Sequence, residues 1–224
     1  MTYTIYFIRH GFTERNYGGV LVGAKGPSLR YPLSDAGREE LEQQHRDHPM
    51  PEAPLLYSSP AFRSFETAMI LYPGMDVHVL QDLRELDFGD CDGMPAAEVN
   101  AGGHNEGFRT MALEHALPGG ETIRSCRDRA IRSFDRILDE MDLHGAHTAA
   151  VVTHSVLMMT MFFHCAETDL PRDQLFAPNG MGYTLLFDRD QWQRERQFRI
   201  GGMIPHGAQR PDMSKSPYYV PDEE

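Results

Sequence analysis

Residues 3–8, YTIYFI, are followed directly by residues 9–16, RHGFTERN. The first run is rich in β-branched and aromatic residues, which is typical of a buried strand. Arg9, His10 and Gly11 therefore stand where a strand ends. A glycine lets backbone amides approach an anion, an arginine offers a planar fork of donors that matches phosphate oxygens, and an imidazole can attack phosphorus. The stretch predicts an anion-binding turn that contains a nucleophile, provided that matching partners occur elsewhere in the chain.

The composition fits one large α/β domain and limits the class of partner. The chain has 224 residues, of which 41% are hydrophobic and 24% are charged, enough to bury a sizeable core. It carries 21 basic and 33 acidic side chains, hence a formal net charge of -12. Such an excess of acid argues against nucleic acid or an anionic membrane as a partner. An anionic substrate would need a local basic pocket. A homodimer is left open.

Cysteine usage and the absence of a targeting pattern favour the cytoplasm. The three cysteines are widely spaced and odd in number, without zinc-site spacing, which fits a reducing compartment (Cys91, Cys126 and Cys165). The N-terminus lacks the basic region of a signal peptide. The longest apolar stretch, residues 149–163, is interrupted by polar residues 153–155 and is too short to span a bilayer.

Hydrophobic periodicity predicts alternating strands and helices. We expect strands over residues 3–8, 55–59, 77–80, 148–153, 183–187 and 197–200, and helices over 34–48, 60–71, 123–141 and 156–165. This alternation predicts an α/β fold, a three-layer α/β/α sandwich whose central sheet is mostly parallel with an edge antiparallel strand. We expect one domain over residues 1–200 with a cap-like insertion at about 94–118, then an extended or disordered tail over 201–224.

Polar residues follow three of the expected strands. Arg9-His10, Ser58-Ser59 and His154-Ser155 each stand at the carboxyl end of a strand. Ligands of parallel α/β sheets bind beyond these ends, so we expect the three pairs to lie close together.

The three sites supply the parts that phosphoryl transfer needs, which are in-line positioning and charge stabilisation on the phosphoryl oxygens. His10 is the candidate nucleophile and Arg9 a clamp on the oxygens. Arg63 falls about one turn into its helix, where the dipole favours an anion. His154 would donate to the phosphoryl oxygens. Taken singly, Arg63 could equally be a solvated surface residue and His154 a hydrogen-bonded core histidine.

A histidine nucleophile also requires a general acid for the leaving oxygen. Glu85 is the candidate, because a partly desolvated carboxyl facing a phosphate dianion has a raised pKa. The competing acids are Asp82, Asp87 and Asp92, and spacing alone does not choose among the four.

The motifs together resemble the histidine phosphatase superfamily, in its phosphoglycerate-mutase-like branch. They occur in the family's order and cover residues 3–160, about two-thirds of the chain. The resemblance rests on Arg9-His10-Gly11-x-Thr13-x-x-Asn16, Ser59-x-x-x-Arg63-x-x-x-Thr67-Ala68, Leu83-x-Glu85-x-x-x-Gly89 and a hydrophobic strand ending in His154. The acid-phosphatase branch typically has Arg and Pro where this chain has Thr13 and Asn16.

The resemblance implies a role for each motif residue. His10 would be phosphorylated, and Arg9, Arg63 and His154 would form the phosphate pocket. Asn16 would contact the phosphoryl oxygens, Glu85 would be the proton donor, and Gly11, Thr13 and Ser155 would complete substrate binding. Family members need no metal, and we expect no cofactor. His144 and His147 are expected at the surface rather than at a metal.

The sequence departs from the family pattern at several places. Ser155 stands where a glycine is common. The connection from Tyr17 to Tyr31 is longer than usual, and Tyr31 replaces an acid common before the Pro-Leu pair. Cys91-Asp92 replaces a usual Trp-Glu, which we interpret as structural. Since the 17–31 connection borders the pocket in relatives, a particular relative's substrate does not transfer safely to this chain.

The insertion distinguishes a phosphatase from a mutase. In the branch that this chain resembles, glycolytic mutases carry a basic cluster in the insertion, which holds the substrate carboxylate. Residues 94–118 of this chain instead contain Glu98, Glu106 and Glu114 and the single Arg109. We therefore predict a phosphomonoester hydrolase acting on a small phosphorylated metabolite. Mutase-type phosphoryl transfer and a non-catalytic phospho-ligand-binding relative are the alternatives. The apolar residues of the insertion could meet substrate or simply pack (Phe108, Met111 and Leu113).

Overall fold

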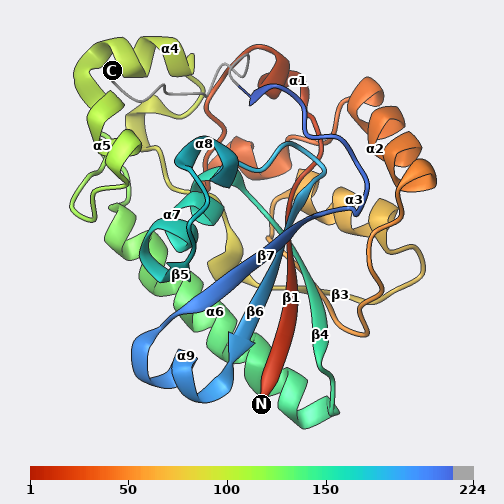
Figure 1. Cartoon of the computed structure of the whole chain (residues 1–224). Coiled ribbons are helices and arrows are strands. Elements are labelled where there is room, and N and C mark those ends of the chain that lie inside the picture. The colour runs from red at the N-terminus through yellow and green to blue at the C-terminus, as the bar shows by residue number, and fades with distance from the viewer. Residues whose placement is uncertain (214–224) are drawn as a thin grey trace.

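The computed structural model describes residues 1–213, apart from the side chains of Asn105, Arg172 and Asp173, and it is built on a central sheet (Figure 1). Within this part of the chain seven strands pair in the order β3-β2-β4-β1-β6-β7-β5. β6 is antiparallel to both of its neighbours, and the other strand pairs are parallel, so the expected mostly parallel α/β sheet is confirmed. The strands are β1 Thr2–Arg9, β2 Leu56–Ser58, β3 Val77–Val79, β4 Thr148–Thr153, β5 Ala166–Glu167, β6 Gly182–Asp188 and β7 Phe198–Ile204.

The antiparallel strand lies inside the sheet, because β7 pairs along its outer side and the short β5 pairs beyond β7. β7 continues to Ile204, whereas the sequence predicted that a tail begins at residue 201. That boundary was wrong. The pairing of β6 and β7 shifts register at the glycines 201 and 202, and it resumes beyond them with Met203 opposite Tyr183 and Ile204 opposite Gly182. Residues 214–224 of the predicted tail lie outside the described residues.

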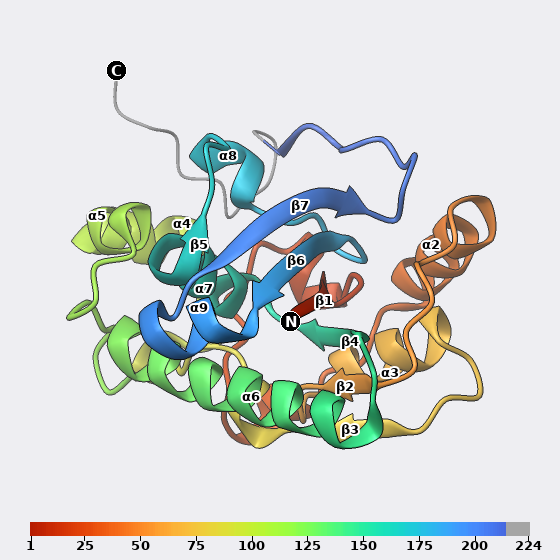
Figure 2. The ribbon, with the colours of Figure 1, turned by 60° about the horizontal axis from the view of Figure 1, so that its bottom comes forward.

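The helices cover both faces of the sheet (Figure 2). α6 and α7 pack on one face, against Phe7 and Val151, while α2 and α3 pack on the other, against Ile8 and Val152. Neighbouring residues of one strand thus face opposite layers, as the two-residue period of a strand requires. The helices are α1 Glu14–Tyr17, α2 Asp35–Asp47, α3 Phe62–Leu71, α4 Ala96–Val99, α5 Asn105–Thr110, α6 Ile123–His144, α7 Ser155–Cys165, α8 Arg172–Leu175 and α9 Arg189–Glu195. In the described residues no helix is long and apolar enough to cross a membrane.

Local chemistry explains where the long helices begin and end. The Ser34 side chain accepts the amide hydrogen of Gly37 at the start of α2, as expected of an N-cap. Thr122 caps α6 in the same way, and Gly145 ends that helix with a φ of 63°. Glycine is favoured there because a side chain strains the left-handed conformation. α6 therefore extends three residues beyond the predicted residue 141.

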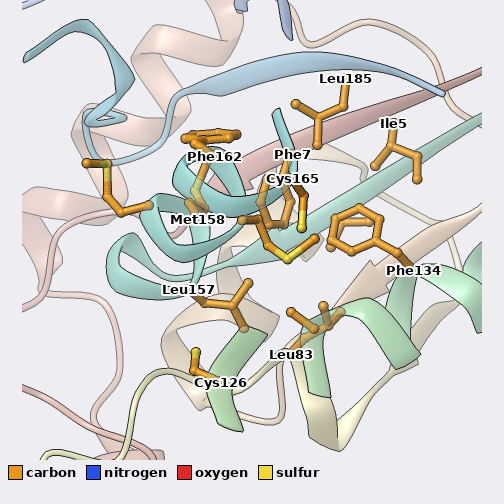
Figure 3. Packing of buried hydrophobic residues seen from close by; sticks show 14 of the residues in the cluster. Ile5, Phe7, Leu83, Cys126, Phe134, Leu157, Met158, Phe162, Cys165 and Leu185 are labelled. Atoms are coloured by element: carbon orange, nitrogen blue, oxygen red, sulfur yellow. The ribbon is translucent and has the colours of Figure 1, made fainter. Parts of the chain in front are cut away.

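The larger core lies between the sheet and the α6–α7 layer (Figure 3). Phe7 of β1 meets Phe134 of α6 edge-on with ring centroids 5.2 Å apart, and Phe162 of α7 at 6.0 Å. Such edge-to-face pairs add to the gain from burying their area. The core therefore fixes β1 against both helices, and β1 carries the backbone of Arg9.

The insertion over residues 94–118 forms α4, a π turn over Asn100–His104, and α5. It lies at the end of the molecule where β1 and β4 terminate (Figure 1). Met111 is buried in the larger core, and Phe108 and Leu113 pack partly buried against it. These three side chains thus act as packing residues here, and a cap over the site stays a prediction.

Candidate active site

The ends of β1, β2 and β4 bring the predicted residues together. Arg9 pairs with Thr153, and Ser58 pairs with Val152, so the three strands finish level with one another. The amide of His10 then donates to the Thr153 carbonyl at 3.0 Å. The His10 and His154 rings lie with centroids 5.2 Å apart at an interplanar angle of 63°. The expected convergence at the carboxyl ends is confirmed.

The tautomer of His10 follows from its two contacts. Nδ1 lies 2.7 Å from the Gly11 carbonyl oxygen, which can only accept, so the neutral ring carries its proton on Nδ1. Nε2 is left with a lone pair, and it accepts the Arg63 Nε–H at 3.3 Å. Burial, together with Arg63 and Arg9, holds the pKa of His10 well below its usual range. The ring is therefore neutral near pH 7 and directs a basic nitrogen at Arg63.

Arg63 lies in the first turn of α3 and is 1% exposed. Its Nη2 lies 3.2 Å from His154 Nδ1, so the guanidinium contacts both imidazoles. The guanidinium also donates to carbonyl oxygens of the 17–31 segment, with Ser28 O at 2.7 Å from Nη1 and Val22 O at 3.2 Å from Nη2. The side chain is therefore a fixed part of the site and not a solvated surface residue.

His154 is fully buried and held by Ser59, to which the sequence prediction gave a place at a strand end but no role in the site. Its Nε2 lies 2.7 Å from Ser59 Oγ, with Ser64 Oγ farther away at 3.4 Å. Because Arg63 can only donate to Nδ1, the neutral ring carries its proton on Nε2 and gives it to Ser59. Burial and the nearby Arg63 lower the pKa of His154 well below its usual range. Ser59 stands directly after β2, at the strand end where the three pairs were expected to meet.

Arg9 is held from the opposite side by the segment that precedes β6. Its Nη1 donates to the Ala177 carbonyl at 2.9 Å, and its guanidinium carbon lies 4.9 Å from the centre of the Phe176 ring. Asn179, which the sequence did not single out, donates from Nδ2 to the His10 carbonyl at 2.9 Å. This segment therefore fixes both the Arg9 side chain and the backbone of His10.

Glu85 binds the start of α7, next to His154. Its carboxylate accepts the amide hydrogens of Val156 at 3.1 Å and Leu157 at 3.1 Å, together with that of Leu86 at 2.8 Å. These donors favour the charged form, but burial outweighs them and raises the pKa of Glu85. The group is thus suited to hold a proton more readily than an ordinary glutamate.

The three competing acids are engaged elsewhere. Asp82 pairs with Arg84 and Arg132, and Asp87 forms an ion pair with Lys25. The Asp92 carboxylate binds Gly23 and Ser28 of the 17–31 segment. Of the four candidates, Glu85 is the one whose carboxylate binds backbone amides at the start of α7, the helix that directly follows His154.

Two of the residues predicted to bind substrate take part in local hydrogen bonds. The Gly11 amide donates to Thr67 Oγ1 at 2.9 Å and is not directed at an anion. Thr13 is the N-cap of α1, where its side chain and the Asn16 side chain form a capping box. A nearby hydroxyl and a helix end engage these groups, and the substrate contacts of Gly11 and Thr13 stay predictions.

For Asn16 and Ser155, contact with a phosphate stays a prediction. Asn16 Oδ1 is bound by the Thr13 amide and hydroxyl at 3.0 Å each, so an anion would meet the Nδ2 group. Ser155 begins α7, and its buried hydroxyl has no hydrogen-bond partner among the described residues.

The site thus gathers two guanidinium groups, two neutral imidazoles and a buried carboxyl at the end of a parallel sheet. Arg9 and Arg63 can stabilise an anion, and the Nε2 of His10 can attack it. Among the described side chains, no group of three or more His, Cys, Asp or Glu residues is arranged to hold a metal ion. The arrangement suits the chemistry of a phosphate ester.

Comparison with known proteins gives the class. Residues 5–198 match the family model of the histidine phosphatase superfamily (branch 1), and the chain belongs to this family. The phosphoglycerate mutase of Bacillus anthracis shares the fold, with a TM-score of 0.72 at 20% identity over 90% of this chain and 92% of that one. The predicted family and the phosphoglycerate-mutase-like fold are therefore confirmed.

The curated relatives of this chain include phosphatases. Phosphoserine phosphatase 1 of Hydrogenobacter thermophilus is 29% identical over 192 residues, which are 80% of this chain and 83% of the relative. Glucosyl-3-phosphoglycerate phosphatase of Mycolicibacterium vanbaalenii is 30% identical over 183 residues, 78% of each chain. These relatives agree with the predicted class of phosphoric monoester hydrolases.

Proposed function

We propose that this protein hydrolyses a small phosphomonoester through a phosphohistidine formed on His10. The observation that carries the proposal is the pair of contacts on its ring. The Gly11 carbonyl holds the proton on Nδ1, and Nε2 keeps a lone pair beside the Arg63 guanidinium. A neutral imidazole in a cationic, buried site can act as a nucleophile without first losing a proton.

In the first step, the Nε2 lone pair of His10 attacks phosphorus and forms an N–P bond. The P–O bond to the alcohol breaks, and its electron pair stays on the leaving oxygen, which takes the proton of Glu85. Arg9 and Arg63 stabilise charge on the phosphoryl oxygens. His154 can donate to them from Nδ1 once the negative charge of the phosphate favours its protonated form. The phosphate dianion itself favours the acid form of Glu85, because a nearby negative charge raises a carboxyl pKa further.

In the second step, water attacks the phosphoryl group and Glu85, now a carboxylate, takes the proton of that water. The N–P bond breaks, its electron pair returns to Nε2, and inorganic phosphate leaves. Glu85 is again protonated, and His10 is again neutral. The balance is one ester and one water converted to one alcohol and one phosphate, with no metal or cofactor in the proposed steps.

The charges of the insertion support hydrolysis over mutase chemistry. Arg109 donates to both carboxylate oxygens of Glu106, at 2.7 Å each. Glu114 pairs with Arg124 of α6. The one arginine of the insertion, which has no lysine, is therefore neutralised by its neighbour, and this makes a carboxylate-binding cluster of the mutase kind a poor fit.

The first test compares His10→Ala with His144→Ala, a histidine exposed near the end of α6. Phosphate release is measured on a panel of phosphorylated metabolites that includes phosphoserine, glucosyl-3-phosphoglycerate, sugar phosphates, nucleotides and an aryl phosphate. We expect His10→Ala to lose turnover and His144→Ala to retain it. Undiminished phosphate release by His10→Ala would refute the assigned site, and an inactive parent protein would favour a binding role.

A second test separates hydrolase from mutase. The protein is supplied with 3-phosphoglycerate and 2,3-bisphosphoglycerate, and isomerisation and phosphate release are followed together. We expect release of phosphate from the panel without rapid isomerisation. Fast isomerisation with negligible release would overturn the hydrolase proposal.

A further inference from the structure

The connection between Tyr17 and Tyr31 is fixed along the segment that follows Glu85. Leu21 exchanges backbone hydrogen bonds with this segment, to Met94 O at 2.9 Å and from the Gly93 amide at 2.9 Å. Lys25 forms an ion pair with Asp87. The connection is therefore a built part of the site, and its carbonyl groups reach Arg63.

One carboxylate, that of Asp92, holds this connection at two points. Its Oδ1 accepts the amide hydrogen of Gly23 at 2.8 Å, and its Oδ2 accepts the hydroxyl hydrogen of Ser28 at 2.7 Å. Ser28 is buried, so the second bond is shielded from competing water. A carboxylate has two acceptor oxygens in a fixed geometry, which suits it to join two separate points of one segment.

The same two points face Arg63 on their other side. The Gly23 N–H and the Val22 carbonyl belong to one peptide group, and that carbonyl accepts Arg63 Nη2 at 3.2 Å. The Ser28 carbonyl accepts Arg63 Nη1 at 2.7 Å. Asp92 and the guanidinium thus lie on opposite sides of the same two residues. The negative carboxylate also polarises the peptide group toward the positive guanidinium, which strengthens both bonds.

We propose that Asp92 is the positioning residue for Arg63, acting through the Val22–Gly23 peptide and Ser28. The carboxylate fixes two carbonyl acceptors, and these fix the plane of the guanidinium whose Nε and Nη2 face His10 and His154. Without Asp92, the two carbonyls are no longer held, and the long Arg63 side chain gains rotamers that do not meet the phosphate. The proposal gives the Asp92 carboxylate a role in the site, and it rests on the proposed function.

A double-mutant cycle tests this coupling. Asp92→Ala is made in the parent protein and in Arg63→Ala, and kcat/KM is measured with a reactive aryl phosphate. In the parent, loss of Arg63 alignment should lower kcat/KM by roughly 10- to 100-fold, because small displacements in a catalytic site are costly. In the Arg63→Ala background, Asp92→Ala should change kcat/KM less than about two-fold, since contacting groups of one network are not additive.

The dissociation constant of inorganic phosphate provides a second readout, measured by calorimetry on the same four proteins, and it remains usable if Arg63→Ala is too slow to assay. Ser28→Ala removes one of the two anchors and takes the place of Asp92→Ala if the latter does not fold. Asp82→Ala is the control, because this aspartate pairs with Arg84 and Arg132 outside the 17–31 segment. It should leave both readouts within about two-fold of the parent.

The outcomes are distinct from those of the proposed function. One contrary result is that Asp92→Ala lowers kcat/KM and phosphate affinity equally in the parent and in the Arg63→Ala variant, and another is that it lowers them in neither. Either result would show that the positioning role is wrong, even if hydrolysis depends on His10. If His10→Ala still releases phosphate, the proposed function itself fails. A loss that Asp92→Ala causes in the parent protein, which contains Arg63, but not in the Arg63→Ala variant supports the role of Asp92.

Discussion

At the residue scale, hydrogen bonds to neighbouring residues engage one ring nitrogen of each catalytic histidine and leave the other nitrogen facing the site. Gly11 engages Nδ1 of His10, and Ser59 engages Nε2 of His154. The two rings therefore present opposite nitrogens, Nε2 in one and Nδ1 in the other, and both contact Arg63. An anion that binds Arg63 would meet both of these nitrogens.

Burial of neutral His10 predicts a pH dependence of stability. The unfolded residue has a pKa of about 6.5 and takes up a proton as the pH falls below it, whereas the folded residue, with its lowered pKa, does not. The unfolded state then binds more protons, so the folded state loses stability as the pH falls. His10→Ala removes this loss.

We therefore expect the Tm difference, His10→Ala minus parent, to become more positive from pH 7.5 to pH 5. Thermal unfolding across this range by circular dichroism provides the measurement. A difference that stays constant or becomes more negative would show that folded His10 takes up a proton as readily as an unfolded histidine.

The role of Glu85 predicts a dependence on the leaving group. In Glu85→Gln, no acid protonates the leaving oxygen, so kcat/KM for an alkyl phosphate should fall by about 10²–10⁴-fold. A nitrophenyl phosphate needs little protonation and should lose much less. The raised pKa of Glu85 means that its acid form is lost as the pH rises, so the parent's kcat/KM should decline on the alkaline side with alkyl esters. Equal losses for both esters would contradict the assignment.

Single residues were predictable where a motif placed them at a strand end, and less so where local bonds compete. His10, Arg63 and His154 lie together as expected. Gly11 and Thr13 also fit the motif, but a neighbouring hydroxyl and a helix end satisfy their polar groups. A sequence pattern does not reveal such competition between helix caps and ligand contacts.

At the element scale, α6 holds the segment that carries Glu85. Arg129 is 1% exposed and donates to the backbone carbonyls of Asp82 at 2.8 Å, Arg84 at 2.6 Å and Glu85 at 2.9 Å. Its charge is balanced by Glu121, which receives two hydrogen bonds from the guanidinium, at 2.8 Å and 2.9 Å. The buried ion pair therefore connects the helix to the segment of the proposed acid.

Glu121→Ala should destabilise the protein markedly, because it leaves a buried guanidinium without its counter-ion. We expect a loss of about 3–5 kcal/mol in the free energy of unfolding. Glu114→Ala is the matched control, since Glu114 also pairs with an arginine of α6 but is largely exposed, and it should cost at most about 1 kcal/mol. Urea unfolding of the three proteins measures both. Equal effects of the two substitutions would contradict the structural role of the buried pair.

The elements themselves were predicted closely, but their contacts were not. Periodicity indicated α6 and its buried face, and strand ends were correct within one or two residues for β1, β2 and β4. Arg129 belongs to a helix face that hydrophobic periodicity leaves unassigned. The backbone carbonyls that Arg129 binds lie 44 to 47 residues away in the chain, and these contacts follow only from the tertiary arrangement.

At the scale of the whole molecule, the site depends on the core that sets β1 against α6 and α7. Phe134 is fully buried there and touches Phe7, Phe187 and Phe198. Phe134→Ala should lower the free energy of unfolding by about 3–5 kcal/mol, from lost burial and the cavity left behind.

Leu143→Ala, at an 80% exposed position of the same helix, is the control and should change stability by no more than about 0.5 kcal/mol. Urea unfolding curves of both variants provide the comparison. A small effect at Phe134 would mean that the α6 contact contributes little to the fold.

The layered architecture was predictable because strands and helices alternate and parallel strands need crossovers. Strand order was not, since the same alternation fits several sheets. β6 reads as one of a terminal pair of strands, yet it lies antiparallel between β1 and β7. The antiparallel pairing of β1 with β6, from Thr2 opposite Asp188 to Ile8 opposite Gly182, sets that position.

The central claim is that the phosphoryl group passes through His10 Nε2. The most direct measurement is rapid acid-free quenching of turnover with an aryl phosphate, followed by peptide mass spectrometry under alkaline conditions. The account predicts one acid-labile phosphate on the peptide that contains His10, absent from His10→Ala and accumulating when Glu85→Gln slows hydrolysis of the adduct. Turnover that proceeds with no phosphorylated His10 at any quench time would contradict it.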